Sequence, residues 1–157
     1  MPVVIPFQRF LEEQREPVFR FLVASVGRDG ADDCFQETFL SAMKAYPKLR
    51  AGSNHRAWVM TIAHRKAMDH HRARARGAIP VEDVPEVAVE DPPLADDQTW
   101  ARVRELPPKQ RAAVLLRYAG DLTHAEVAVA LGCSEDAARR SAHEGLKKLR
   151  NEMSPTT

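Results

Sequence analysis

Basic side chains recur at helical spacing between residues 58 and 76 of this 157-residue chain. One arc of the predicted helix suits a protein core, and it holds Trp58, Val59, Ile62 and Ala63. The opposite arc holds Thr61, His64, Arg65, Met68, His71 and Arg72, and Arg74 and Arg76 extend the positive run. Asp69 is the only acidic residue from residue 56 to residue 76. Guanidinium and imidazole groups on the outer side of a packed helix suit the phosphates of a nucleic acid. A solvated basic helix explains the stretch equally well when it is taken alone.

Turn and capping residues in the last third of the chain predict a helix-turn-helix. The predicted helices run over residues 100–106, 109–118 and 124–131, and from residue 135 onward. Thr123 can cap the third of these, and Glu126 stands where it completes a capping box. Gly132 suits the left-handed position after that helix, and Ser134 can cap the next one. Two helices joined by a short turn with glycine are typical of a DNA-binding helix-turn-helix.

The last helix carries basic residues on the side away from its apolar positions. The apolar positions are Ala138, Ala142, Leu146 and Leu149, and the outer basic positions are Arg139, Arg140, His143 and Lys147. Arginine can bind guanine through two hydrogen bonds in the major groove, while lysine and histidine can contact phosphates. An αα-hairpin with pairs such as Arg140 and Glu144 is the alternative. The turn residues favour nucleic-acid binding.

The net charge of +1 conceals two basic segments separated by an acidic one. Residues 1–76 carry a net charge of +5, residues 77–97 a net charge of −7, and residues 98–157 a net charge of +3. The acidic segment also contains four prolines and no aromatic residue, which is typical of an extended linker. We therefore expect an all-α chain: two small helical domains, residues 1–76 and 98–157, joined by an acidic, proline-rich linker at residues 77–97.

The first domain should contain two helices before the basic one. The first is predicted over residues 7–26, where Pro17 could divide it, and a turn is expected at residues 27–30. An amphipathic helix follows over residues 32–46. Its predicted core positions are Phe35, Phe39, Ala42, Met43 and Tyr46, and its outer positions are Asp33, Gln36, Glu37, Leu40 and Lys44. Taken alone, these polar residues fit an ordinary solvated face.

Several classes of protein are disfavoured by composition. The mean hydropathy is −0.41 and no apolar run reaches membrane length, so we expect no membrane association. The N-terminal residues lack the basic leader of a signal peptide, so we expect the protein to act in the cytoplasm. Cys34 and Cys133 are too few for a disulfide framework or a thiolate metal site. No cofactor, metal or catalytic residue is expected.

Four blocks of the sequence resemble, in order, the bacterial extracytoplasmic-function (ECF) sigma factors. Residues 31–40, ADDCFQETFL, resemble the family's Asp-x-x-Gln-Glu-x-Phe signature. Residues 56–65, RAWVMTIAHR, resemble its next block, and residues 69–72 match the tail of that block. After the linker, residues 105–118 resemble the opening of its fourth conserved region and residues 123–134 its helix-turn-helix. Each block is a weak signal alone, and the ordered set is a strong one.

The resemblance implies a promoter-specificity subunit that is not itself an enzyme. It implies core RNA polymerase as a partner, bound through the β′ clamp helices and the β flap, together with promoter DNA and an anti-sigma factor. Asp33, Gln36 and Glu37 would face the polymerase. Ser53, Asn54, Arg65, His71 and Arg72 would bind the −10 element, and Arg139, Arg140, His143 and Lys147 would bind the −35 element.

The chain departs from the family pattern at two places. Arg65 stands where the family usually has asparagine, so a role tied to that amide is not implied. The last helix opens with residues 134–141, SEDAARRS, in place of Ser-x-Gly-Thr-Val-Lys-Ser-Arg, so the family's promoter preference does not carry over.

Three other functions are compatible with parts of the sequence. A stand-alone helix-turn-helix regulator leaves the Asp33, Gln36 and Glu37 face unexplained, and a sigma-like decoy would only sequester an anti-sigma factor. A metalloenzyme built on His64, Asp69, His70 and His71 is disfavoured, because adjacent histidines point to different sides of a helix and no HExxH spacing occurs.

Overall fold

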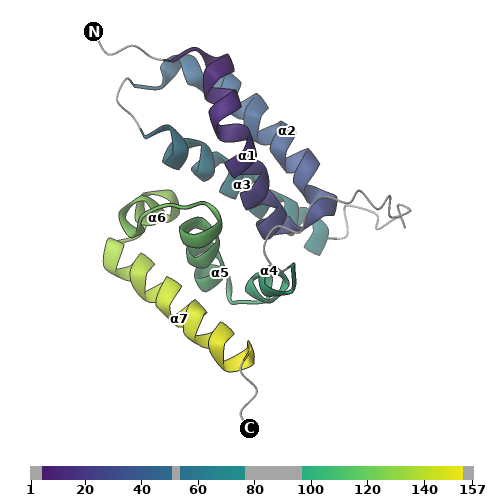
Figure 1. The fold of residues 1–157 in the computed structure, drawn as a ribbon, viewed down its shortest axis with the longest axis vertical. Coiled ribbons are helices and arrows are strands. Elements are labelled where there is room, and N and C mark those ends of the chain that lie inside the picture. Colours follow the sequence, from purple (N-terminus) through teal and green to yellow (C-terminus); the bar gives the residue numbers. More distant parts are fainter. Residues whose placement is uncertain (1–4, 51–53, 77–96, 154–157) are drawn as a thin grey trace.

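The computed structural model describes residues 5–50, 54–76 and 97–153, and these residues form helices without any strand. Figure 1 shows the helices as two packed groups. The first group contains α1 (Phe7–Val26), α2 (Arg28–Ala45) with a short 3₁₀ turn (Tyr46–Lys48), and α3 (His55–Ala75). The second contains α4 (Asp97–Arg104), α5 (Pro108–Val114) with a π-helical turn (Leu115–Ala119), α6 (His124–Leu131) and α7 (Glu135–Met153). The expected all-α architecture is confirmed.

The first group is a three-helix bundle in which each helix packs against the other two. Helix α1 continues through Pro17 without dividing. The turn predicted at residues 27–30 is wrong, because Gly27 alone separates α1 from α2. Gly27 has φ 81° and ψ 171°, a conformation that glycine adopts without strain, so a single residue reverses the chain.

Helix α2 is rotated relative to the predicted core stripe. Phe39, Ala42 and Tyr46 are buried as expected, but Met43 is 50% exposed. The positions that contact α1 and α3 instead are small, and they are Ala31, Cys34 and Thr38. Small side chains at these positions let the three helix backbones approach closely, which turns Met43 toward solvent.

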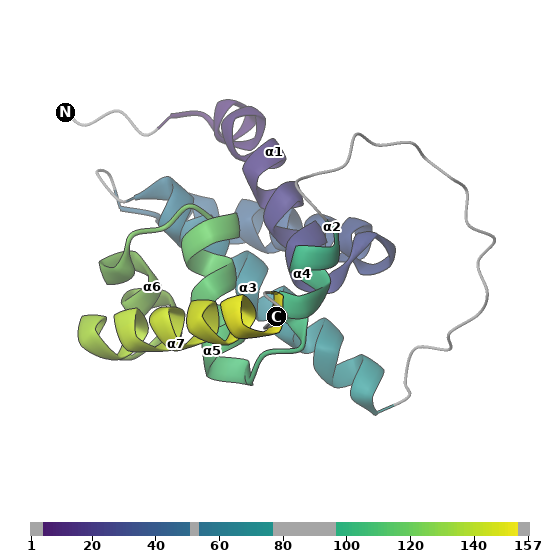
Figure 2. The same ribbon diagram turned by 60° about the horizontal axis from the view of Figure 1, so that its bottom comes forward.

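Helix α3 begins at a capped N-terminus and buries one face. The Asn54 Oδ1 atom accepts a hydrogen bond from the Ala57 N–H at 3.0 Å. The fully buried residues are Val59, Met60, Ala63 and Ala67, which include two of the four predicted core positions. The other two, Trp58 and Ile62, are partly buried and pack against the same core. Figure 2 shows the C-terminal turns of α3 projecting beyond the other helices in that view.

The second group contains the predicted helix-turn-helix. Thr123 and Glu126 form both hydrogen bonds of the capping box at the start of α6. Gly132 ends α6 with φ 67°, and the Ser134 hydroxyl accepts a hydrogen bond from the Ala137 N–H at 3.1 Å. The helix predicted over residues 109–118 is not regular, since its second half widens into the π-helical turn. Such turns are rare and often lie at functional positions.

Helix α7 packs tightly against α5 at Gly145. A Cβ atom at this position would lie 2.8 Å from Val114 Cγ2 and 3.4 Å from Leu106 Cδ1. We therefore expect Gly145→Ala to lower the free energy of unfolding by about 1–2 kcal/mol, despite the better helix propensity of alanine. Chemical denaturation measures this, with His143→Ala on the exposed face as the control. An unchanged or raised stability would show that α5 and α7 can move apart freely.

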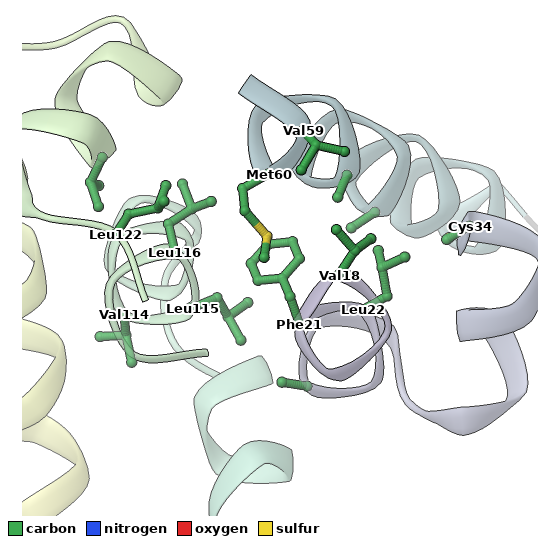
Figure 3. Close-up of a cluster of buried hydrophobic side chains, with 14 of the residues drawn as sticks. Val18, Phe21, Leu22, Cys34, Val59, Met60, Val114, Leu115, Leu116 and Leu122 are labelled. Atoms are coloured by element: carbon green, nitrogen blue, oxygen red, sulfur yellow. The ribbon is translucent and has the colours of Figure 1, made fainter. Parts of the chain in front are cut away.

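The two groups of helices are packed against each other. The π-helical turn and α4 contact α1, and α6 contacts α3. At the centre, Phe21 of α1 and Met60 of α3 face Leu115 and Leu116 of the π-helical turn (Figure 3). The described domains therefore share one continuous apolar core.

Candidate functional site

The outer face of α7 presents the four basic residues that the sequence pattern predicts there. Arg139, Arg140, His143 and Lys147 are all exposed, while Ala138, Ala142 and Leu149 are buried on the opposite side. The Arg139 guanidinium lies 3.0 Å from Glu135 and 4.0 Å from Asp136. Exposed ion pairs of this kind contribute at most about 1 kcal/mol, so Arg139 can exchange its carboxylates for a base or a phosphate.

The residues assigned to the −10 element do not all lie on one exposed face. Arg65 and Arg72 are exposed on α3, about 10 Å apart along the helix, and Arg72 pairs with Asp69. Asn54 is exposed at the start of the helix, and Ser53 lies outside the described residues. His71 is half-buried, with its Nε2 atom 2.9 Å from the Ser25 carbonyl of α1. Burial and the nearby Arg111 lower the pKa of His71.

His64 also turns inward, contrary to its predicted place on the basic arc. Burial between the two domains, reinforced by the charge of Arg111 on α5, lowers the pKa of His64 to about 4. The ring is therefore neutral at physiological pH. No local sequence signal predicts this, because Arg111 belongs to the other domain.

His64 should make stability depend on pH in a defined window. Its pKa is lowered in the folded state, so the unfolded chain binds the proton first as the pH falls below about 6.5. The free energy of unfolding should fall by up to about 3 kcal/mol between pH 6.5 and pH 4 on this account. In His64→Gln, the free energy of unfolding should fall less over this pH range than in wild type. In His143→Gln, it should fall as much as in wild type. Denaturant titrations at several pH values measure the difference, and parallel pH curves for wild type and His64→Gln would contradict the assignment.

Helix α2 presents a mixed acidic and apolar strip. Asp33, Gln36 and Glu37 are exposed, as predicted. The described part of the chain places no ion-pair partner against Asp33 or Glu37. Leu40 and Met43 continue the same strip and are 54% and 50% exposed. Exposed carboxylates beside large exposed apolar side chains suit a protein partner with basic and apolar groups. The sequence pattern predicts Leu40 on the exposed face but places Met43 in the core, because position 43 also fits the spacing of the buried residues.

The other side chains that could react or bind a metal ion show no arrangement for doing so in the described part of the chain. Cys34 is buried, and its thiol donates a hydrogen bond to the Lys66 carbonyl. Burial raises the pKa of this thiol to about 11. Among the described residues, no cluster of three His, Cys, Asp or Glu side chains could hold a metal ion. Across the same residues, no helix combines the length and apolar character that crossing a membrane requires.

The chain matches known proteins along most of its length. Residues 11–77 match the family model of sigma-70 region 2, and residues 97–149 match that of sigma-70 region 4. It is 36% identical to the ECF RNA polymerase sigma factor SigD of Mycobacterium tuberculosis, over 91% of this chain and 74% of SigD. It is 31% identical to the RNA polymerase sigma factor CarQ of Myxococcus xanthus, over 85% of this chain and 82% of CarQ.

Two solved structures share the fold. One is the sigma factor RpoE in complex with the anti-sigma factor NepR from Bartonella quintana, with a TM-score of 0.76 and 21% identity. That match covers 94% of this chain and 96% of RpoE. The other is CnrH in complex with the cytosolic domain of CnrY, with a TM-score of 0.71 and 19% identity, over 94% and 86% of the two chains.

Proposed function

Since the chain belongs to the extracytoplasmic-function family of RNA polymerase sigma factors, we propose that three surfaces of its two domains join core polymerase to a promoter. Its function is promoter-specific transcription initiation. The polymerase, rather than this chain, would carry out the synthesis of RNA. We expect the chain to act in the cytoplasm. We assign residues 1–76 to the domain for core polymerase and the −10 element, and residues 98–157 to the domain for the −35 element and the β flap. Residues 77–97 are the proposed linker; residues 77–96 lie outside the described part of the chain, and Asp97 already begins α4.

The α2 strip is the surface for the β′ clamp helices. Asp33 and Glu37 offer carboxylates to basic groups, Gln36 offers an amide, and Leu40 and Met43 offer apolar contact area. The observation that carries this assignment is the exposure of all five side chains on one helix face. A stand-alone regulator gives this strip no partner.

The −10 element is assigned to α3 and the residues before it. Arg65 and Arg72 can hold phosphates on the exposed side of the helix. Ser53 and Asn54, at its start, are the side chains for an unstacked base. His71 faces Ser25 in this arrangement, so its contribution to DNA binding requires the ring to leave that carbonyl.

The −35 element is assigned to the exposed face of α7. Arg139 and Arg140, in the first half of the helix, are the candidates for contacts with base edges in the major groove. His143 and Lys147, one and two turns further on, are candidates for phosphate contacts.

An anti-sigma factor is the further partner that we propose. RpoE and CnrH, which share the fold, were solved with NepR and with the cytosolic domain of CnrY. The similarity spans both domains of this chain, so a regulator that contacts both is compatible with it. A decoy that only sequesters such a regulator would share these features and would fail to support transcription.

Binding of the fluorescently labelled chain to purified core polymerase tests this function. We expect saturable binding to core polymerase, and binding to duplex promoter fragments that depends on the polymerase. The chain must first be freed of any co-purified inhibitor. If it then shows no binding to core polymerase and binds duplex DNA by itself, it is a stand-alone regulator instead.

A further inference from the structure

A single carboxylate connects the N-terminal caps of two helices that belong to different domains. Asn54 caps α3 through its Oδ1 atom, and its Nδ2 atom donates a hydrogen bond to Oε2 of Glu126. The other oxygen of Glu126, Oε1, accepts the Thr123 N–H at 2.8 Å and completes the cap of α6. The two residues are 72 positions apart in the sequence. We call this arrangement the cap bridge.

The cap bridge lies at one end of the interface between the domains. At the centre of the interface, Phe21 and Met60 contact Leu115 and Leu116 (Figure 3). Away from the bridge, the Arg104 guanidinium of α4 lies 3.0 Å from the Ala24 carbonyl at the C-terminal end of α1. A positive group at the C-terminal carbonyls of a helix is favourable. Polar contacts therefore flank the apolar centre of the interface.

This closed arrangement is incompatible with simultaneous contact to both promoter elements. The −10 and −35 elements are separated by about 25 base pairs, or roughly 85 Å at 3.4 Å per step. Here α7 packs on α6 and α6 packs on α3, so α3 and α7 are about two helix spacings apart, roughly 20 Å. Helix α6 also engages Asn54, the side chain that we assign to the −10 strand.

We propose that Glu126 is the latch of an autoinhibited closed state, in which the second domain holds Asn54, the promoter contact at the start of α3. This rests on the proposed function, because Asn54 must be a promoter contact for the latch to inhibit. Opening the latch frees the Asn54 amide for DNA while the Thr123–Glu126 cap keeps α6 intact. Core polymerase binds the open state, so its apparent affinity is reduced by the closed fraction.

Glu126→Gln removes the latch without removing the cap. Glutamine also completes a capping box, and its oxygen can accept the Thr123 N–H. Its amide group then faces the Asn54 amide, and two N–H donors cannot bond to each other. Glu144→Gln makes the same chemical change on the exposed side of α7 and is the matched control. Arg104→Met, at α4, removes an independent contact of the interface.

Single-molecule energy transfer on the full chain measures the opening. Cys133 is exposed and Cys34 is buried, so one dye can be placed at Cys133 and the other at an introduced Arg15→Cys. We expect Glu126→Gln to raise the open-to-closed ratio by about threefold to tenfold, Arg104→Met to raise it as well, and Glu144→Gln to leave it unchanged. Core polymerase should bind Glu126→Gln more tightly, by no more than the same factor.

The outcomes separate the latch from the function on which it rests. Identical distance distributions for wild type, Glu126→Gln and Arg104→Met would overturn the latch, whatever the affinity for polymerase. A larger open fraction with unchanged polymerase affinity would overturn autoinhibition. A chain that opens as expected but binds no core polymerase in any variant would overturn the proposed function instead.

Discussion

A protein carrying Asp33→Ala and Glu37→Lys should keep its helical signal and its melting temperature and lose core RNA polymerase in a pull-down. Both side chains are exposed on α2 and face away from the packed bundle. Exposed substitutions of this kind change the free energy of unfolding by about 0.5 kcal/mol or less. Removing one carboxylate and reversing another opposite basic groups should cost about 2–4 kcal/mol of binding, or roughly 30- to 1000-fold in affinity.

The control for this variant makes the same change in net charge on α1. Glu12 and Glu16 are exposed there, and the pair Glu12→Ala, Glu16→Lys should bind polymerase as wild type does. Equal losses in the two double variants would show that net charge, rather than the α2 strip, decides binding. Wild-type affinity in the Asp33, Glu37 variant would remove this surface from the polymerase interface.

The second large effect is expected on promoter preference. Arg139→Ala should relax the preference at one or two base pairs of the −35 element by about 1–3 kcal/mol, because a bidentate contact to guanine is lost. Lys147→Ala should weaken binding to all promoter sequences alike, because one phosphate contact is lost. The slope of log affinity against log salt concentration should become smaller by about one. Transcription from a panel of single-base promoter variants, with the mutant holoenzymes, measures both.

Each of these two variants serves as the control for the other. If Arg139→Ala transcribes every promoter of the panel as wild type does, α7 does not recognise bases through this residue. If it weakens all promoters alike, Arg139 exchanges its carboxylate partners Glu135 and Asp136 for a phosphate rather than for a base.

The features that the sequence predicts well are those that neighbouring residues determine. The capping box of Thr123 and Glu126, the left-handed Gly132 and the Ser134 cap each depend on residues within one turn of each other. The outer face of α7 was predicted correctly for a similar reason, since its buried positions form a regular apolar stripe. Local chemistry was sufficient for these elements.

The features that the sequence could not predict depend on contacts between distant residues. Met43 fits the core period of α2, and only the close packing of α1 and α3 on small residues turns it outward. His64 and His71 fit the exposed arc of α3, but both are partly buried against other helices: the charge of Arg111 on α5 acts on His64, and His71 lies beside the Ser25 carbonyl of α1. The hydrogen bond between Asn54 and Glu126 has no local signal at all.

Run-off transcription from a library of genomic fragments tests the central claim most directly. Core polymerase should be supplied with or without the purified chain, freed of any inhibitor. We predict transcripts that appear only with the chain and whose start sites share sequence elements near −35 and −10. A chain that binds core polymerase but produces no new start site on any fragment would contradict its function as a sigma factor.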